Sequence, residues 1–180
     1  AEWAKEVGPY AIYKEDGLDF QAMWDYRAEK GNLVDFPGSK MISMDEFWSA
    51  QVDVVVPAAL ENSIDAAVAE KIQAKLVCEA ANGPTTPEGD EVLNRKGIIL
   101  TPDILTNAGG VTVSYFEWVQ NLYGYYWSEA EVEAKEDEAM VKAFEALWAI
   151  KEEYGVTVRE AAYMHSVKRV ATAMKLRGWY

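Results

Sequence analysis

Short apolar runs alternate with amphipathic stretches through the middle of the chain, a pattern typical of an α/β fold. Residues 52–56, Val-Asp-Val-Val-Val, are β-branched and almost entirely apolar, as expected for a strand buried on both faces of a sheet. Residues 75–79 and 97–100 have the same character, and the centres of the three runs are separated by an even step of 22 residues. We therefore expect three buried strands.

The stretches between these runs have the features of helices. One covers residues 64–72, and the other covers residues 87–96, with Thr86 as a suitable N-cap and Pro87 in the first helical position. Strand, helix and strand in this order predict parallel strands joined by right-handed crossovers. The pattern thus predicts an α/β fold with an open, doubly wound parallel sheet.

A helix is also predicted before this segment. Apolar residues follow a helical period over residues 18–30, and Gly31 is a suitable C-terminal stop. Residues 44–50 can form a second, shorter helix.

After the third apolar run the chain is predicted to be entirely helical. The first helix covers residues 109–123. The sequences Ser128-Glu-Ala-Glu131 and Thr157-Val-Arg-Glu160 are capping boxes, each of which opens a further helix. We therefore expect a C-terminal helical segment after the sheet.

The net charge limits the possible partners. The 180 residues carry a formal net charge of −13, which repels DNA, RNA and anionic membranes. No apolar run is long enough to span a bilayer, and the chain opens without a signal-type segment. Because Cys78 is the only cysteine, no internal disulfide can form, and we expect a cytoplasmic protein.

A metal site has no support in the sequence. His165 is the only histidine, and it has no second histidine and only one cysteine as possible co-ligands. We predict that no metal is bound and that His165 has a structural or surface role.

Three predicted strand ends carry unusual residues. The first strand runs into Pro57-Ala58-Ala59, whose small side chains would let a flat ligand approach the backbone. The second runs into Ala80-Ala81-Asn82-Gly83-Pro84, and the third leads to Asn107-Ala108-Gly109-Gly110. Ligands of open parallel sheets bind outside the carboxyl ends of the strands, so we expect a binding site here.

The predicted helix start at Asn107 is a candidate anion site. An Asn followed by two glycines offers free N–H groups and the positive end of the helix dipole. Val111, Ser114 and Trp118 would share one face of this helix, so a bound carboxylate could also meet the Ser114 hydroxyl.

Simpler interpretations of these residues remain open. Asn107 could cap the helix, and the two glycines after Ala108 could permit close packing. Ser114 could be a helical serine that hydrogen-bonds to the preceding turn.

Residues 107–121 resemble the signature of glutamate dehydrogenases. They read Asn-Ala-Gly-Gly-Val-Thr-Val-Ser-Tyr-Phe-Glu-Trp-Val-Gln-Asn, and residues 56–59, 81–88 and 176–180 are similar to the same family. The resemblance covers the whole chain and is closest to the NAD-preferring enzymes of anaerobic Gram-positive bacteria.

The resemblance implies an oxidoreductase that interconverts L-glutamate with 2-oxoglutarate and ammonia by hydride transfer with NAD. It implies a homohexamer whose partners are small-molecule substrates. The fold would be a partial Rossmann-type sheet, with a dinucleotide-binding domain at residues 1–106. Residues 107–180 would form helices that complete this domain and pack back on a substrate domain.

The resemblance also assigns roles to single residues. Asn82 and Asn107 match amides near the nicotinamide and its ribose, and Pro57 and Ala58 match the loop beneath the dinucleotide. Glu2 aligns with the end of the second strand, where an acidic residue binds the adenosine ribose. Substrate-binding positions that line the glutamate site are matched by Val111 and Ser114.

This sequence departs from the family pattern in what it lacks. No Gly-x-Gly-x-x-Gly occurs among the twelve glycines, and the family's catalytic lysine and aspartate have no counterpart. We therefore expect no catalytic residue in this chain, and a fragment that supplies the cofactor half of the enzyme.

Two alternatives remain open. The first is a leucine-, valine- or phenylalanine-type amino acid dehydrogenase, against which Ser114 argues, because a hydroxyl has little use in an apolar pocket. The second is a non-enzymatic scaffold fragment or interaction domain, which the missing phosphate-binding loop favours.

Cofactor choice gives a first prediction. A carboxylate at Glu2 can accept hydrogen bonds from both ribose hydroxyls of NAD and repels the 2′-phosphate of NADP. Glu2→Ser should therefore weaken the preference for NAD, measured as the ratio of kcat/KM for NAD and NADP in the complete enzyme. A strong NAD preference that survives this substitution would remove Glu2 from the site.

Overall fold

The computed structural model describes residues 9–179, and the chain divides into two compact units. The N-terminal unit runs to Gln51 and includes Lys71–Gln73. The second unit comprises Val52–Glu70 and continues from Ala74. Each unit is described by itself.

The N-terminal unit combines a small antiparallel sheet with two helices. Strands β1 (Ala11–Tyr13) and β2 (Lys40–Ile42) pair with each other, and neither strand was predicted. Helices α2 (Phe20–Lys30) and α3 (Met44–Trp48) confirm the two predicted helices.

Helix α2 begins and ends where its sequence predicts. The carboxylate of Asp19 accepts a hydrogen bond from the N–H of Ala22, which caps the first turn. Gly31 ends the helix in the left-handed conformation, with φ of 76°.

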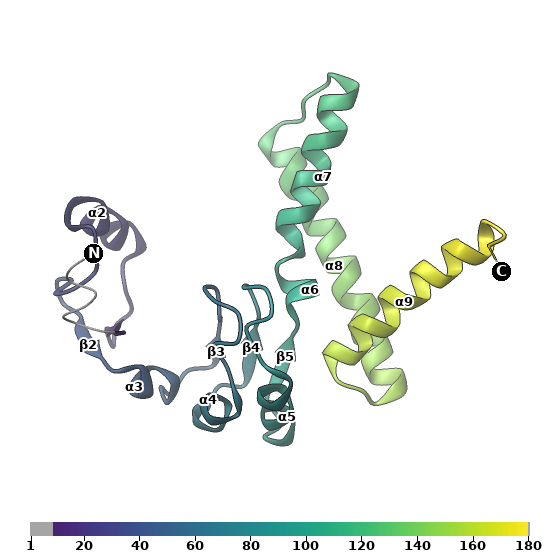
Figure 1. Cartoon of the computed structure of the whole chain (residues 1–180). Coiled ribbons are helices and arrows are strands. Elements are labelled where there is room, and N and C mark those ends of the chain that lie inside the picture. Colours follow the sequence, from purple (N-terminus) through teal and green to yellow (C-terminus); the bar gives the residue numbers. More distant parts are fainter. Residues whose placement is uncertain (1–8, 180) are drawn as a thin grey trace. The chain divides into compact units, whose positions relative to one another are not determined.

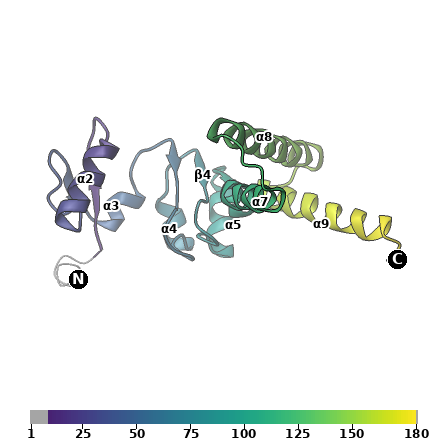
Figure 2. The same cartoon turned by 90° about the horizontal axis from the view of Figure 1, so that it is seen from above.

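The second unit contains the predicted parallel sheet. Strands β3 (Val54–Val55), β4 (Leu76–Cys78) and β5 (Ile99–Thr101) lie in the order β3-β4-β5, and both pairs are parallel (Figure 1). The crossovers contain helices α4 (Ala66–Lys71) and α5 (Pro87–Arg95), which lie on the same side of the sheet (Figure 2). The α/β fold class is confirmed.

The prediction that the first strand is buried on both faces is wrong. Val54 is 45% exposed, whereas Val77 in the central strand β4 is fully buried. Among residues 9–179, strand β3 lies at the edge of the sheet and has a neighbouring strand on one side only. Its side chains therefore gain fewer contacts than those of the central strand.

Four helices follow the sheet. They are α6 (Asp103–Thr106), α7 (Ala108–Tyr123), α8 (Glu129–Tyr154) and α9 (Val158–Leu176). Both predicted capping boxes are present, at Ser128 with Glu131 and at Thr157 with Glu160. The short helix α6 was not predicted. No helix within residues 9–179 is long and apolar enough to cross a membrane.

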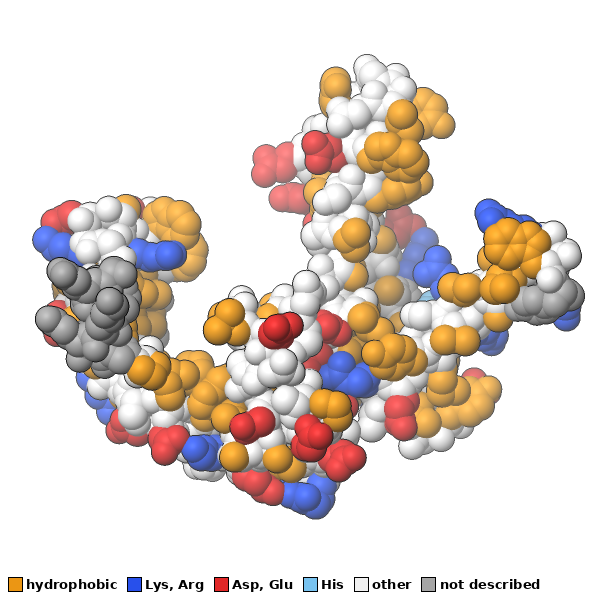
Figure 3. Space-filling model, viewed as in Figure 1, with side chains coloured by type: hydrophobic (Ala, Val, Ile, Leu, Met, Phe, Trp, Pro, Cys, Tyr) orange, Lys and Arg blue, Asp and Glu red, His pale blue; other side chains and the backbone are white. Residues whose placement is uncertain are grey.

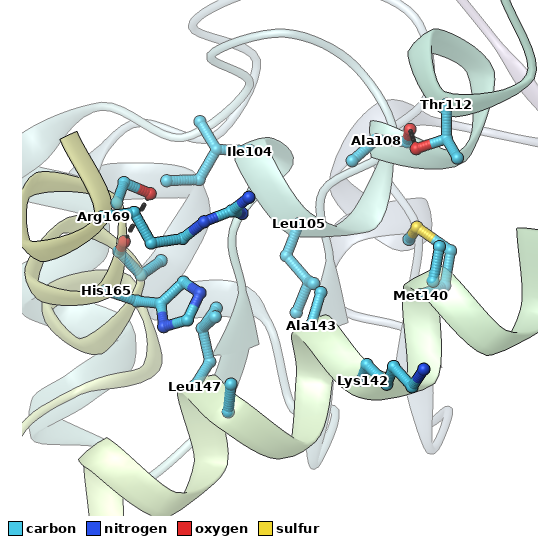
Figure 4. Close-up of a pocket in the computed structure, with 14 residues that line it drawn as sticks. Ile104, Leu105, Ala108, Thr112, Met140, Lys142, Ala143, Leu147, His165 and Arg169 are labelled. Atoms are coloured by element: carbon cyan, nitrogen blue, oxygen red, sulfur yellow. Dashed lines mark hydrogen bonds between the residues drawn. The ribbon is translucent and has the colours of Figure 1, made fainter. Parts of the chain in front are cut away.

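A small apolar core joins three of these helices. Leu105 of α6, Leu147 of α8 and Ala162 of α9 are buried against one another, and Ala143 packs on the cluster. Figure 4 shows Leu105, Ala143 and Leu147 close together where the three helices meet. This core holds the C-terminal helices to the end of β5.

The remaining apolar faces of α7 and α9 are exposed within the described part of the chain. On α7 they include Trp118, which is 58% exposed, and on α9 they include Val167. Figure 3 shows apolar side chains gathered along both helices. The apolar face of α9 that includes Val167 therefore does not belong to the core of this unit.

Helix α5 approaches the loop before α4 very closely at Gly89. A Cβ atom at this position would clash with the backbone carbonyl oxygen of Ile64 and lie 3.2 Å from Cγ2 of Thr85. Gly89→Ala should therefore lower the free energy of unfolding by about 1–3 kcal/mol, the typical cost of overpacking. The shift of the urea unfolding midpoint measures the loss.

Gly110→Ala is the matched control. Gly110 lies inside α7, and a Cβ atom there would meet no atom within 4 Å. Because Ala favours a helix over Gly by roughly 0.5–1 kcal/mol, this variant should keep or gain stability. Equal losses in both variants would contradict the close approach at Gly89.

Candidate functional site

The carboxyl ends of the three parallel strands are tied together by backbone hydrogen bonds. The carbonyl oxygen of Pro57, after β3, accepts hydrogen bonds from the N–H groups of Ala80 (3.1 Å) and Ala81 (2.8 Å), after β4. The N–H of Glu79 donates to the carbonyl oxygen of Thr101 at the end of β5 (3.1 Å). The three predicted strand ends therefore form one continuous edge.

Two candidate residues meet directly at this edge. The side-chain Nδ2 of Asn107 donates a hydrogen bond of 2.7 Å to Oδ1 of Asn82. Asn107 stands at the N-cap position of α7 but makes no side-chain hydrogen bond to that helix, so its side chain does not cap it. Because Oδ1 of Asn82 is taken, the NH₂ group of Asn82 is the donor that this side chain can offer a ligand.

A hollow of about 720 Å³ opens beside this amide pair. It is lined by Ala59, Leu60, Glu61, Ala80, Ala81, Asn82, Asn107 and Val111. Pro57 is buried and reaches the site through its carbonyl oxygen, whereas Ala58 is exposed next to the lining residue Ala59. The hollow lies where ligands of open parallel sheets bind.

The prediction that the helix start at Asn107 offers free N–H groups to an anion is wrong in part. Helix α6 intervenes between β5 and α7, so the N–H of Asn107 already donates to the carbonyl oxygen of Asp103 (3.1 Å). The N–H of Gly110 donates to the carbonyl oxygen of Asn107 (3.3 Å). These donors are therefore used within the backbone and are not free for an anion.

The predicted face of α7 is present, with Val111 and Ser114 both exposed. The Ser114 hydroxyl donates to the carbonyl oxygen of Gly110 (3.0 Å), and Thr112 makes the same kind of bond to Ala108 (2.8 Å). Ser114 thus is a serine that bonds to the preceding turn in this structure. To donate to a substrate carboxylate, its hydroxyl must rotate away from Gly110.

One candidate residue cannot be located, because Glu2 lies outside the described residues. A buried ion pair next to the site was not predicted from the sequence. Glu79 is fully buried at the end of β4 and forms an ion pair of 2.8 Å with Arg159 of α9. A charged residue next to an apolar strand was a visible signal, but its partner lies 80 positions away.

The Arg159 guanidinium carries its charge in a partly buried position. Burial works against the charged form, but hydrogen bonds and charges from Glu79 and Asp90 raise the pKa of Arg159 above its ordinary value. Nε of Arg159 donates to Asp90 at 2.9 Å. Arg159 therefore stays charged and binds two carboxylates at once.

His165 belongs to a different cavity. This cavity of about 550 Å³ lies among α7, α8 and α9, and His165 and Arg169 line it together (Figure 4). Within residues 9–179 no group of three or more His, Cys, Asp or Glu side chains could hold a metal ion.

Known dehydrogenases are similar to this chain over most of its length. Residues 9–178 match the family model described as Glutamate/Leucine/Phenylalanine/Valine dehydrogenase. The chain belongs to this dehydrogenase family. A curated relative, the NAD-specific glutamate dehydrogenase of Clostridioides difficile, is 75% identical over all 180 residues.

Solved structures of the family have the same fold. The glutamate dehydrogenase of Peptoniphilus asaccharolyticus superposes with a TM-score of 0.78 at 53% identity, over 93% of this chain and 37% of that one. The hetero-hexameric glutamate dehydrogenase of Thermus thermophilus, in a leucine-bound form, superposes with a TM-score of 0.85 at 31% identity, over 93% and 39%. This chain spans 43% of the Clostridioides difficile protein, less than half of its length.

Proposed function

We propose that this chain is the cofactor-binding part of an NAD-dependent glutamate dehydrogenase. The enzyme would catalyse the reversible oxidative deamination of L-glutamate to 2-oxoglutarate and ammonia. The observation that carries the proposal is 75% identity with an NAD-specific glutamate dehydrogenase over the whole of this chain. The amide pair at the strand ends supports a cofactor site at this edge of the sheet.

The residues at the strand ends fit the nicotinamide end of NAD. Ala58, Ala59, Ala80 and Ala81 leave room for a flat ring, and Asn82 offers amide hydrogens to a carboxamide or a ribose hydroxyl. Asn107 holds the Asn82 side chain in place, and Pro57 supports the backbone below. When bound, NAD supplies the acceptor for the hydride.

The substrate would lie along the exposed face of α7. Val111 lines the hollow beside the amide pair, and Ser114 follows one turn later on the same face. We propose that the Ser114 hydroxyl exchanges its bond to Gly110 for one to the side-chain carboxylate of glutamate. Substrate and nicotinamide would then be neighbours.

The catalytic groups would lie in a part of the protein that this chain does not contain. We propose a boundary in function at residue 107, with a dinucleotide-binding part at residues 1–106 and helices at residues 107–180 that pack on a substrate domain. The exposed apolar faces of α7 and α9 support this packing. We further propose a cytoplasmic hexamer, in keeping with the hexamer named for the Thermus thermophilus relative.

A second candidate activity is amino acid dehydrogenase with an apolar substrate. The family model also covers leucine, phenylalanine and valine dehydrogenases. Ser114 favours glutamate, because its hydroxyl can bind a carboxylate, whereas an apolar substrate side chain offers it no group to bind.

The activity itself gives a prediction. The complete protein that contains this chain should reduce NAD when supplied with glutamate, whereas the 180-residue chain purified alone should not. Hydride transfer needs a bound substrate and a proton acceptor, which we assign to the remainder of the protein. NADH absorbance measures both. Turnover by the isolated chain would refute this division of roles, and a complete protein that prefers leucine would favour the second candidate.

Ser114 gives a sharper prediction. Ser114→Ala should raise the KM for glutamate, with a loss in kcat/KM corresponding to about 1–3 kcal/mol if the hydroxyl meets a buried carboxylate. Thr112→Ala is the matched control, because Thr112 makes the same bond to the preceding turn from a different face of α7. Unchanged kinetics in Ser114→Ala would leave Ser114 with its structural role alone.

A further inference from the structure

Arg159 occupies an unusual position for a cation. It is the second residue of α9, whose start is fixed by the capping box of Thr157 and Glu160. A positive charge in the first turn of a helix is unfavourable, because that end of the helix dipole is itself positive. Val158 and Ala161 of this turn are buried, and α9 contacts β5, so the turn that carries Arg159 is packed in place. Other interactions must stabilise the guanidinium there.

Three carboxylates from three different elements supply these interactions. Nη2 of Arg159 donates to Glu79 at 2.8 Å and Nε donates to Asp90 at 2.9 Å, while Nη1 lies 4.0 Å from Asp103. Glu79 is fully buried, and the side chain of Arg159 is only 22% exposed. Within residues 9–179, Arg159 is the one cation that forms an ion pair with any of these three acids.

Two of these carboxylates, those of Glu79 and Asp103, also hold the loop and the helix that carry the amide pair. The second oxygen of Glu79 accepts a hydrogen bond from the N–H of Asp103, the first residue of α6 (2.9 Å). Asp103 in turn accepts one from the N–H of Gly83, which directly follows Asn82 (2.8 Å). Helix α6 ends at Thr106, and Asn107 is its C-cap. One chain of contacts thus runs from Arg159 to both amides.

We propose that Arg159 is a positioning residue for the nicotinamide end of the cofactor site. It neutralises Glu79 and Asp103, so that these acids can hold the Asn82 turn and the start of α6 in register. Arg159 would touch neither cofactor nor substrate, and it would act through the placement of Asn82 and Asn107. The inference rests on the proposed cofactor site and adds a role for α9, which lies outside the strand-end hollow.

Electrostatics gives the expected direction of the effect. Without the guanidinium, Glu79 keeps a buried charge with no counter-charge, next to two further carboxylates. Mutual repulsion then acts on the acids that hold the Asn82 turn. A lysine would restore the charge but not the planar fork that reaches two carboxylates at once.

The test measures NADH binding by the complete protein through fluorescence titration, which does not depend on turnover. Arg159→Met should raise the Kd for NADH by about tenfold, the change expected when the Asn82 amide loses one hydrogen bond to the cofactor. Arg159→Lys should show a smaller increase. Glu79→Gln combined with Arg159→Met should bind NADH more tightly than Arg159→Met alone, because it removes the uncompensated buried charge.

A double-mutant cycle separates positioning from general damage. If Arg159 acts through Asn82, then Arg159→Met should weaken NADH binding much less in an Asn82→Ala background than in the wild type. Two controls accompany the cycle. Arg95→Met removes an exposed ion pair with Glu70, and Trp127→Ala removes a ring that packs on Phe116, outside the chain of contacts from Arg159 to the amides. Both should keep the wild-type Kd for NADH.

Each outcome decides the proposal. A folded Arg159→Met protein with the NADH affinity of the Trp127→Ala control would overturn it, as would full additivity with Asn82→Ala. If Arg159→Met does not fold, Arg159→Lys is compared with the same controls, and wild-type NADH affinity in Arg159→Lys overturns the proposal. Failure of the proposed function would differ, because the wild-type protein itself would then not reduce NAD with glutamate.

Discussion

The parallel pairing of β4 with a strand on each side is the interaction on which the rest of this unit depends. Parallel strands place all their carboxyl ends at one edge, and here β3, β4 and β5 end beside one another. The backbone bonds from Ala80 and Ala81 to Pro57 then fix the spacing of the ends. Only because of this pairing do two asparagines that are 25 residues apart share a hydrogen bond.

Local features of the fold could be predicted from the sequence, because they depend on neighbouring residues alone. The β-branched runs, the Thr86 cap with Pro87 and the two capping boxes all act within one turn or one strand. The β1–β2 pair was missed because each strand has three residues and its stability comes from a partner far along the chain. Helix α6 was missed because four residues are too short to show a helical period.

The same distinction applies to the candidate site. The meeting of Asn82 and Asn107 follows from topology, so sequence reasoning could reach it. The exposure of Val54 and the pairing of Glu79 with Arg159 depend on which elements pack together, and no local pattern contains that information. The role of Ser114 stays a prediction, since its hydroxyl bonds to its own helix in this structure.

A buried acid at the end of an apolar strand is a costly choice for stability alone. Replacing buried ion pairs by apolar residues is often neutral or stabilising, so packing does not require Glu79 to be charged. The carboxylate instead fixes an orientation, because its two oxygens accept hydrogen bonds from the N–H of Asp103 and from the guanidinium of Arg159. An apolar side chain would fill the same space but would not fix the position of the first residue of α6.

The exposed apolar stripe of α7 has a consequence for the life of the protein in the cell. Val111, Tyr115, Trp118 and Leu122 recur every three to four residues and are all more than half exposed. A newly made chain exposes this stripe until another surface covers it. Exposed apolar surfaces attract chaperones and proteases. In the proposed enzyme, chaperones and proteases would therefore recognise unassembled chains through the same helix that is proposed to bind the substrate.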